Sequence, residues 1–456
     1  MRLLLVTYYF PPSGGAGVQR TLKFAKYLRT SGVEPVVLTV EAGAYPSLDP
    51  TLEADVPDGV EVVRTRSLDP FGLYGALTGR SRREAVAVGS VGGADSFGKR
   101  LGLWARANVF LPDARVGWVP FAARAARRLV RAGRVDAVLT SGPPHSTHLV
   151  GLALRRALDA RGIPWVADFR DPWTGINFYD ELPMTGPARA LDAALERRVL
   201  RAADAVVTVS PTWARELEAK GGVEGVRVIQ NGFDPDDFGR QGAGGKGEEG
   251  SAPLETTPPQ SAPPSAEAFA LTHVGSLYGS RNPEALWAAV AALRNRGAGR
   301  LRVRLVGRVD DAARASLARH GLTEVADEGG VVPHAEAVAA MAEGDLLFLS
   351  IEPVRNADGI LTGKLYEYLA SGRPVLALGP PDGDAARLLG STGGGRLLAW
   401  DDAAGIEAAL RDAYTAWERG DPLPGAPPAA LAPLSRPAQA RELAGLVREL
   451  AEGRGG

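Results

Sequence analysis

Two charged side chains stand close together in the C-terminal half of the sequence, in the stretch "ILTGKLYEYLASGRPVLAL". Lys364 and Glu367 are three residues apart, so a helix would present both on one face. A lysine can neutralise a diphosphate, and a carboxylate can accept two hydrogen bonds from a ribose diol, as acidic residues do in dinucleotide sites. The same spacing also suits an exposed ion pair that contributes little to stability. The stretch therefore predicts either one side of a nucleotide site or a solvated pair.

A further cation lies upstream, in "THVGSLYGSRNPEAL". An apolar strand runs into Gly275 and Ser276, and a short loop then carries Arg281 to the start of a helix. A guanidinium matches phosphate oxygens with two parallel hydrogen bonds. The alternative is a solvated arginine beside a helix cap, but together with Lys364 the pattern favours phosphate binding.

A glycine-rich turn follows the first apolar strand, in "YYFPPSGGAGVQR". Gly14 and Gly15 lie in the turn, and a helix begins near Gly17. Glycine lets the backbone approach a ligand closely, and a helix N-terminus attracts anions. The stretch is not G-x-G-x-x-G and lacks the Lys and Ser or Thr of a P-loop, so a tight strand–helix turn is the alternative. Its position at a strand end favours a binding role.

Two histidines follow another strand, in "TSGPPHSTHLVGL". His145 comes directly after the strand end, where a side chain can reach a ligand, and His148 is less favoured. The alternative is a pair of polar residues at a helix start, one of them partly buried. No carboxylate stands at ligand spacing, so we do not expect a metal site at these histidines.

Charged residues also end the strand in "VADFRDPWTG". Asp168, Arg170 and Asp171 are expected to form an ion-pair network that supports a cleft, since such pairs are common. Asp171 could instead contact a hydroxylated substrate. Farther on, "IQNGFDPDDF" has strong turn chemistry and predicts a structural role for Asp234.

A basic amphipathic helix is predicted in "FAARAARRLVRAGR". Its arginines recur at helical spacing beside Ala, Leu and Val; they are Arg124, Arg127, Arg128, Arg131 and Arg134. Such a helix can lie on an anionic membrane surface, and a solvated basic face is the equally good alternative.

The composition is that of an ordinary globular protein. The 456 residues are 45% hydrophobic and 23% charged with a formal net charge of −1, so nothing indicates a nucleic-acid partner. The absence of cysteine excludes disulfides and thiolate ligands, and five histidines without an H-E-x-x-H pattern argue against a zinc site. The start "MRLLLVTYYF" is followed by "PPSGGAG" instead of a cleavage site, so it predicts a buried strand. Without an apolar run long enough to span a bilayer, we expect a cytoplasmic protein.

Apolar strand-like runs alternate with helix-like runs along most of the chain. The runs include "RLLLVTYY", "EPVVLTV", "VDAVLTS", "PWVADFR" and "ADAVVTVS", then "AFALTHVGS", "LRVRLVG", "GGVVP", "DLLFLS" and "RPVLAL". Continuous apolar strands separated by helices predict parallel sheets covered on both faces. We therefore expect an α/β protein with two doubly wound, Rossmann-like domains, residues 1–238 and 268–435, facing across a cleft that binds ligands. A last helix, 436–452, should pack on the first domain.

Two segments interrupt the alternation. Residues 239–267 are Gly, Pro, Ser and Glu with almost nothing to bury, which predicts a disordered linker or loop. Segment 75–115 is Gly-rich with scattered basic residues and suits a surface loop.

Taken together, these stretches resemble the family 4 glycosyltransferases of the GT-B fold. The resemblance rests on "FPPSGGAGVQR", "SGPPHSTHLVG", "DFRDPW" and "IQNGFD" in the first half, and on "HVGSLYGSRNP", "VVPHAEAVAAMAEGDLLFL" and "GKLYEYLASGRPVLAL" in the second. The last is the most specific. The resemblance covers nearly the whole chain apart from the linker and segment 75–115.

The resemblance also implies roles for individual residues. Glu367 would hold the donor ribose, Arg281 and Lys364 the donor diphosphate, and His145 would lie near the transferred sugar. With the glycine-rich turn and the "DGILTG" turn, the implied donor contacts are Gly14, Gly15, Gly275, Ser276, Asp358, Gly359, Ile360, Leu361, Thr362 and Glu367. In one respect the chain departs from the family: the usual first Glu of an E-x7-E pattern is Gly359 here. Either Asp358 substitutes for it, or backbone groups of the turn meet the sugar.

The implied activity is transfer of a sugar from a nucleotide diphosphate sugar to an acceptor hydroxyl, with retention of configuration and without a metal or other cofactor. The expected partners are a nucleotide sugar and a glycan or lipid-linked acceptor, with peripheral contact to an anionic membrane left open. Closure of the domains would exclude water and avoid hydrolysis. Two alternatives stay open: a nucleotide-sugar 2-epimerase on the same fold, and a non-catalytic paralogue that binds nucleotide sugar.

Overall fold

The computed structural model describes residues 1–455 apart from residues 44, 46, 69–96, 178 and 240–266. The expected linker therefore lies almost wholly outside the described residues, as do residues 75–96 of the segment that suits a surface loop. The chain divides into two compact units. Unit 1 is Met1–Gln230 with Gln439–Gly456, and unit 2 is Asn231–Ala438.

Unit 1 contains a seven-stranded parallel sheet among its described residues. The strands are β1 (Arg2–Val6), β2 (Glu34–Val40), β3 (Glu61–Thr65), β4 (Ala137–Gly142), β5 (Trp165–Phe169), β6 (Ala205–Thr208) and β7 (Arg227–Val228). They lie in the order β3-β2-β1-β4-β5-β6-β7. The order reverses direction between β1 and β4, and such a switch point is where doubly wound sheets bind ligands.

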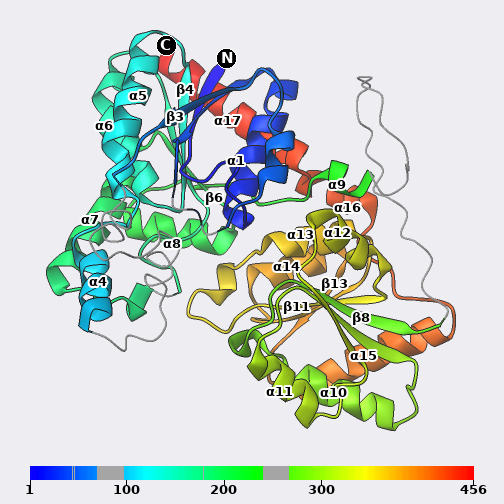
Figure 1. The fold of residues 1–456 in the computed structure, drawn as a ribbon. Helices are drawn as coiled ribbons and strands as arrows, with labels where there is room; N and C mark the ends of the chain where they lie inside the picture. The colour runs from blue at the N-terminus through cyan, green and yellow to red at the C-terminus, as the bar shows by residue number, and fades with distance from the viewer. Residues whose placement is uncertain (44, 46, 69–96, 178, 240–266, 456) are drawn as a thin grey trace. The chain divides into compact units, whose positions relative to one another are not determined.

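Helices cover both faces of this sheet (Figure 1). Those described are α1 (Ala16–Tyr27), α4 (Phe97–Asn108), α5 (Val119–Arg131), α6 (Ser146–Asp159), α7 (Gly186–Ala202), α8 (Pro211–Gly221) and α17 (Arg436–Gly455), with short 3-10 turns η1 (Arg29–Ser31), η2 (Pro50–Asp55), η3 (Val116–Trp118) and η4 (Tyr179–Glu181). Apolar side chains of α5, α6 and α7 form one core, and those of α1 and α17 form the other. Each central strand is buried on both faces, which explains its continuous apolar sequence.

The described residues of unit 2 repeat the architecture with a six-stranded parallel sheet. Its strands are β8 (Phe269–Val274), β9 (Leu301–Val306), β10 (Ala326–Gly330), β11 (Leu346–Ser350), β12 (Val375–Leu378) and β13 (Gly395–Leu398), in the order β10-β9-β8-β11-β12-β13. The described helices are α9 (Pro235–Gly239), α10 (Glu284–Asn295), α11 (Asp311–Arg319), α12 (His334–Glu343), α13 (Gly363–Ala370), α14 (Asp384–Thr392), α15 (Ala403–Glu418) and α16 (Pro428–Leu431), with 3-10 turns η5 (Gly279–Arg281), η6 (Ala357–Gly359) and η7 (Ala432–Leu434). Here the switch point lies between β8 and β11.

The predicted fold class, two doubly wound α/β sheets, is confirmed. One predicted strand was wrong: "GGVVP" was expected to be a strand, but β10 is Ala326–Gly330, and Val331 beyond it is 79% exposed. The reason is that β10 pairs only with β9 at the sheet edge and leaves most of its side chains in solvent. An apolar run is therefore not needed there. In segment 75–115, residues Phe97–Asn108 form α4 instead of a loop.

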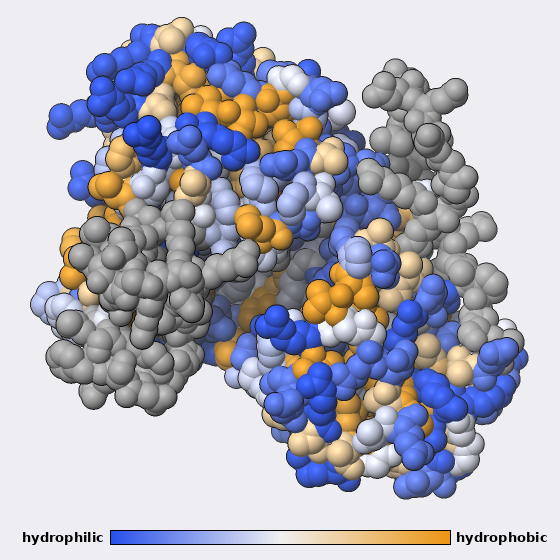
Figure 2. Space-filling view, in the orientation of Figure 1, coloured by the Kyte–Doolittle hydropathy of each residue, from blue (hydrophilic) through white to orange (hydrophobic). Residues whose placement is uncertain are grey.

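The apolar side of the predicted basic helix, α5, is buried in the unit 1 core. Arg124, Arg128 and Arg131 are exposed on its other side. The helix therefore has no free apolar face to insert into a bilayer, and only its charges are available. On the face drawn in Figure 2, hydrophilic residues predominate and apolar patches interrupt them. In the described ranges, no helix has the length and apolar character to cross a membrane.

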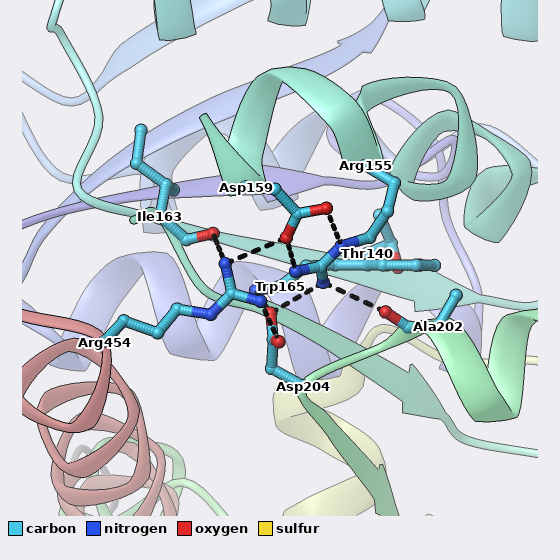
Figure 3. Close-up of polar contacts among 8 residues, drawn as sticks. All are labelled: Thr140, Arg155, Asp159, Ile163, Trp165, Ala202, Asp204 and Arg454. Atoms are coloured by element: carbon cyan, nitrogen blue, oxygen red, sulfur yellow. Dashed lines mark hydrogen bonds and ion pairs between the residues drawn. The ribbon is translucent and has the colours of Figure 1, made fainter. Parts of the chain in front are cut away.

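The end of α17 is fastened to unit 1 by charged side chains at the amino ends of β5 and β6 (Figure 3). Arg454 contacts Asp204 and donates to Asp159 over 3.2 Å. Arg155 donates to the same Asp204 over 2.9 Å, and Asp204 also accepts the backbone N–H of Trp165 over 2.7 Å. This network lies at the edge of the sheet opposite the carboxyl ends of the strands. Because it joins Arg454 to Asp159 and Asp204, it anchors the end of α17 at that edge.

Candidate functional site

In unit 2, loops and one helix bring charged residues to the switch point between β8 and β11. The loop after β8 begins with Gly275, whose φ of 150° favours glycine, and leads to Arg281 at the end of η5. The hydroxyl of Tyr368 in α13 accepts the backbone N–H of Val274, the last residue of β8, over 2.7 Å. This contact holds α13, which carries Lys364 and Glu367, beside the strand end.

Lys364 and Glu367 form the ion pair that their spacing predicts. Lys364 Nζ donates to Glu367 Oε2 over 2.8 Å, and the two side chains are 34% and 20% exposed. The buried side of α13 carries apolar and aromatic residues, and the pair lies on the other side. The side chains are thus partly solvated and able to exchange partners.

Arg281 also has an acidic partner, which the sequence analysis missed. Nε and Nη2 of Arg281 both donate to Oε2 of Glu352 over 3.3 Å. Glu352 follows the end of β11 by two residues, so its position after an apolar strand was the available signal. The pair places the Glu352 carboxylate at the switch point, beside Arg281, which is predicted to bind phosphate.

Two histidines complete the cluster, and neither was predicted to be there. His273 in β8 is buried, with Nδ1 3.0 Å from the carbonyl oxygen of Phe348. Burial, with smaller contributions from the charges of Lys364 and Arg281, lowers the pKa of His273 to about 4, so both cations lie within electrostatic reach of one imidazole. His334 Nε2 lies 3.1 Å from Asp237 Oδ2. This hydrogen bond raises the pKa of His334, and the nearby Glu367 carboxylate raises it too.

The "DGILTG" turn approaches the start of α13 with its backbone. Asp358 is exposed within η6, Gly359 is buried, and Ile360 is partly buried. The side chain of Leu361 packs into the unit 2 core, so it can offer a ligand only its backbone. Thr362 is the N-cap residue of α13, and its buried Oγ1 has no hydrogen-bond partner among the described residues.

In unit 1, His145 lies directly after β4 at the switch point of that sheet. Its ring stacks on Trp173 at 5.3 Å between ring centres, with 8° between the planes. His145 is 8% exposed, and neither ring nitrogen has a partner in the part of the chain that the structure describes. Burial holds the pKa of His145 well below its usual range, with smaller contributions from His148 and Arg170. The imidazole is therefore neutral at neutral pH, with one nitrogen free to accept a hydrogen bond.

A cavity of about 140 Å³ opens beside this imidazole within unit 1. Its lining is mostly apolar, with charged groups at a few points: Arg106, Ala107, Leu111, Pro112, Asp113, Pro143, Pro144, His145, Trp173, Ile176, Tyr179, Leu182, Met184 and Asp192. Asp192 accepts Trp173 Nε1 over 2.9 Å and the Tyr179 hydroxyl over 2.8 Å. Burial raises the pKa of Asp192 to about 6. By accepting the hydrogen bond from Trp173 Nε1, the Asp192 carboxylate orients the indole on which His145 stacks.

Asp168 has a different partner from the one predicted. It forms a buried ion pair with Arg20, with Arg20 Nη2 2.9 Å from Asp168 Oδ1, and it also accepts the Ser141 hydroxyl over 2.7 Å. Arg170 donates instead to backbone carbonyls, with Nε 3.0 Å from Gly142 O and other donors on Gly17 and Pro143. Arg170 thus joins the loop after β4 to the start of α1, and Arg20 joins α1 to β5.

Within the described residues, no hydrogen bond or ion pair joins Asp171 to the Asp168–Arg20 pair. It is partly exposed, and burial raises the pKa of its carboxyl group while the charge of Arg170 lowers it. Asp171 therefore stays a candidate for a substrate contact.

The glycine-rich turn leads into α1 as predicted from its position after β1. The Gly14 N–H donates to Ser47 O over 3.0 Å, and Gly15 precedes α1 with a φ of 90°, which favours glycine. Among the described residues, no side chain caps this helix start. His148, in contrast, is a core residue: its ring stacks on Phe169 at 4.3 Å, and Nδ1 lies 3.0 Å from Thr140 Oγ1.

Comparisons with solved structures show likenesses over the full chain at low sequence identity. A glycosyltransferase from Rickettsia africae ESF-5 is 13% identical over 98% of both chains, with a TM-score of 0.58. HepE from Anabaena, in complex with UDP, is 15% identical over 99% of this chain and 98% of that one, with a TM-score of 0.54. A Listeria monocytogenes protein assigned as a UDP-N-acetylglucosamine 2-epimerase is 11% identical over 99% and 97%, with a TM-score of 0.53.

These likenesses show the fold alone. No curated protein sequence matches the chain. Residues 14–237, which include the glycine-rich turn, His145 and the Asp168 loop, match the model of Glycosyltransferase Family 4. The two doubly wound sheets agree with the GT-B architecture. Residues 14–237 therefore match glycosyltransferase family 4, and the chain has the GT-B fold.

Proposed function

We propose that the protein transfers a sugar from a nucleotide diphosphate sugar to an acceptor hydroxyl. The observation that carries the proposal is the position of two cations at the switch point of unit 2: Arg281 lies in the loop after β8, and Lys364 lies on α13, which the Tyr368–Val274 hydrogen bond ties to the end of β8. In the proposal the two cations bind the diphosphate and Glu367 binds the ribose diol. Negative charge develops on the departing diphosphate during transfer, so fixed cations lower the barrier.

Unit 1 supplies the groups for the acceptor in this proposal. The neutral His145 imidazole, with unpartnered ring nitrogens beside a cavity, can accept a hydrogen bond from a sugar or acceptor hydroxyl. The uncapped start of α1 behind Gly14 and Gly15 offers backbone N–H groups to an anion. In this proposal, Arg170 and the Asp168–Arg20 pair hold the loop after β4 and helix α1 in position.

Several finer features stay predictions. We propose retention of configuration, no requirement for a metal, a hexosyl donor, and a role in polysaccharide or glycolipid assembly in the cytoplasm. Contact with an anionic membrane would use the exposed arginines of α5, because its apolar side is buried.

The test is transfer by the purified protein from UDP-, GDP- and ADP-sugars to a panel of glycan and lipid-linked acceptors, with products identified by mass spectrometry. Acceptor-dependent release of nucleoside diphosphate, with a matching gain in acceptor mass, supports the proposal. Proton NMR of the product's anomeric centre tests retention. Binding of a donor without transfer to any acceptor would favour a non-catalytic role.

A nucleotide-sugar 2-epimerase is the second candidate, because a chain assigned to that activity has a similar fold and the cluster contains carboxylates suited to addition and elimination. A time course with nucleotide sugar alone separates the two activities. An epimerase converts the sugar without an acceptor, and a transferase does not.

A further inference from the structure

We infer that Glu352 is the carboxylate that contacts the transferred sugar, and that it holds Arg281 until the donor displaces it. The inference rests on the proposed function and extends it to the position left open by Gly359. It assigns to Glu352 the role that the sequence pattern left to Asp358 or to the backbone of the turn.

Glu352 has a fixed backbone beside the switch point. The preceding residue, Ile351, donates its N–H to Leu378 O over 2.8 Å and accepts Trp400 Nε1 over 2.9 Å. The first bond continues the sheet pairing of β11 with β12, and both bonds hold the chain where it leaves the strand. The Glu352 side chain is 22% exposed, so it lies partly buried at the carboxyl end of β11.

The contact between Glu352 and Arg281 is of a kind that exchanges readily. Both Arg281 donors meet the same oxygen, Oε2, at 3.3 Å, whereas charge-assisted pairs are usually about 2.7–2.9 Å long and often bidentate. In the described part of the chain, no donor meets the other oxygen, Oε1. Arg281 is 42% exposed and keeps further N–H donors for a phosphate.

Each cation of the cluster thus has its own carboxylate, in the pairs Arg281–Glu352 and Lys364–Glu367. A diphosphate that binds both cations competes with both carboxylates. Each displaced carboxylate then needs new hydrogen-bond donors, and the hydroxyls of a nucleotide sugar supply them on the two sides of the diphosphate. Because Glu367 is assigned to the ribose, Glu352 faces the sugar.

Asp358 is the weaker candidate for this contact. Its side chain is exposed within η6, and no hydrogen bond or ion pair of its carboxylate is found within the described ranges. Glu352, in contrast, already touches a cation that would bind the phosphate bearing the sugar. A carboxylate beside that phosphate is within reach of the sugar hydroxyls.

The test compares the wild-type protein with Glu352→Gln by calorimetric titration. The probes are UDP, GDP and ADP and the corresponding nucleotide glucoses, using the nucleotide that the wild type binds. The uncharged amide of the variant no longer competes with the diphosphate for Arg281. Affinity for the nucleoside diphosphate should therefore stay equal or rise by about threefold. Affinity for the nucleotide sugar should fall by about tenfold, because a charged acceptor of sugar hydroxyls is lost. The ratio of the two affinities is the diagnostic quantity.

Two control variants make the outcomes distinct. Asp358→Asn tests the competing carboxylate, and Glu328→Gln removes an exposed carboxylate that pairs with Arg314 elsewhere in unit 2. Equal losses for nucleoside diphosphate and nucleotide sugar in Glu352→Gln would mean that Glu352 only positions Arg281, and would overturn the inference. A changed ratio in Asp358→Asn alone would assign the contact to Asp358. A wild-type protein that binds none of the probes would reject the proposed function itself.

Discussion

Lys364 Nζ lies 2.8 Å from Glu367 Oε2, one helical turn apart at the start of α13. By distance and exposure alone, the pair resembles many surface ion pairs, which contribute little to stability. Its neighbours distinguish it. The charge of Lys364 acts on the buried His273 together with that of Arg281, and the charge of Glu367 acts on His334. The pair is therefore part of a convergent cluster at a strand end.

The buried Arg20–Asp168 pair should govern the stability of unit 1 and leave nucleotide affinity unchanged. Asp168→Asn leaves the Arg20 charge buried with fewer partners, so we predict a loss of about 3–5 kcal/mol in the free energy of unfolding. Denaturant unfolding of the variant measures it. Disrupting the exposed Arg134–Glu61 pair with Arg134→Ala should cost less than about 1 kcal/mol. Equal effects of the two changes would contradict the structural role of Asp168.

His148 should make the protein less stable as the pH falls below the pKa of a free histidine. Burial lowers the pKa of His148 in the folded protein from 6.5 to about 3. Above pH 6.5 both states are neutral; below it, the unfolded chain takes up a proton that the folded chain refuses. The free energy of unfolding therefore falls by up to about 1.4 kcal/mol per pH unit until the pH nears the folded pKa.

The variant His148→Gln should lack this part of the pH dependence, as measured by denaturant unfolding between pH 7 and pH 4.5. His334 provides a control of opposite sign, because its hydrogen bond with Asp237 raises its pKa. Its stabilising contribution is complete below pH 6.5 and is lost as the pH rises through the folded pKa. The prediction fails if His148→Gln keeps the wild-type slope.

The strands and the fold class could be predicted because central parallel strands are buried on both faces and are continuously apolar. The spacing of Lys364 and Glu367 also predicted their contact, since helix geometry is local. The partner of Asp168 could not be predicted in this way, because Arg20 is 148 residues away in sequence and only the sheet order brings the two together. Glu352 and His334 were missed for the same reason. The edge strand β10 was not predicted at its actual position, because its exposed side chains need no apolar pattern.

Arg454 should control fraying at the end of α17. Its contacts with Asp204 and Asp159 fasten the helix end, while Asp204 keeps Arg155 as a second partner (Figure 3). We predict that Arg454→Ala costs about 1 kcal/mol and speeds amide hydrogen exchange in the last two turns of α17 only. The matched control, Arg441→Ala on the exposed side of the same helix, should leave exchange unchanged. Unchanged exchange in Arg454→Ala would contradict the anchoring role.

Transfer should not depend on a divalent metal. In the proposed function Arg281 and Lys364 supply the positive charge that the departing diphosphate requires. We therefore predict the same initial rate with and without EDTA in the transfer assay. A rate that EDTA abolishes and added Mg²⁺ restores would contradict this part of the account.

The central claim is that the cluster at the β8–β11 switch point binds the donor nucleotide. The most direct measurement is calorimetric titration of UDP, GDP and ADP and their glucose conjugates into the wild type, Lys364→Ala and Glu367→Ala, with Glu336→Ala on the exposed side of α12 as a control. We predict that one nucleotide binds the wild type and the control equally, and that each cluster variant loses about 2 kcal/mol, roughly 30-fold, with an unchanged thermal unfolding temperature. Wild-type affinity in both cluster variants would contradict the claim.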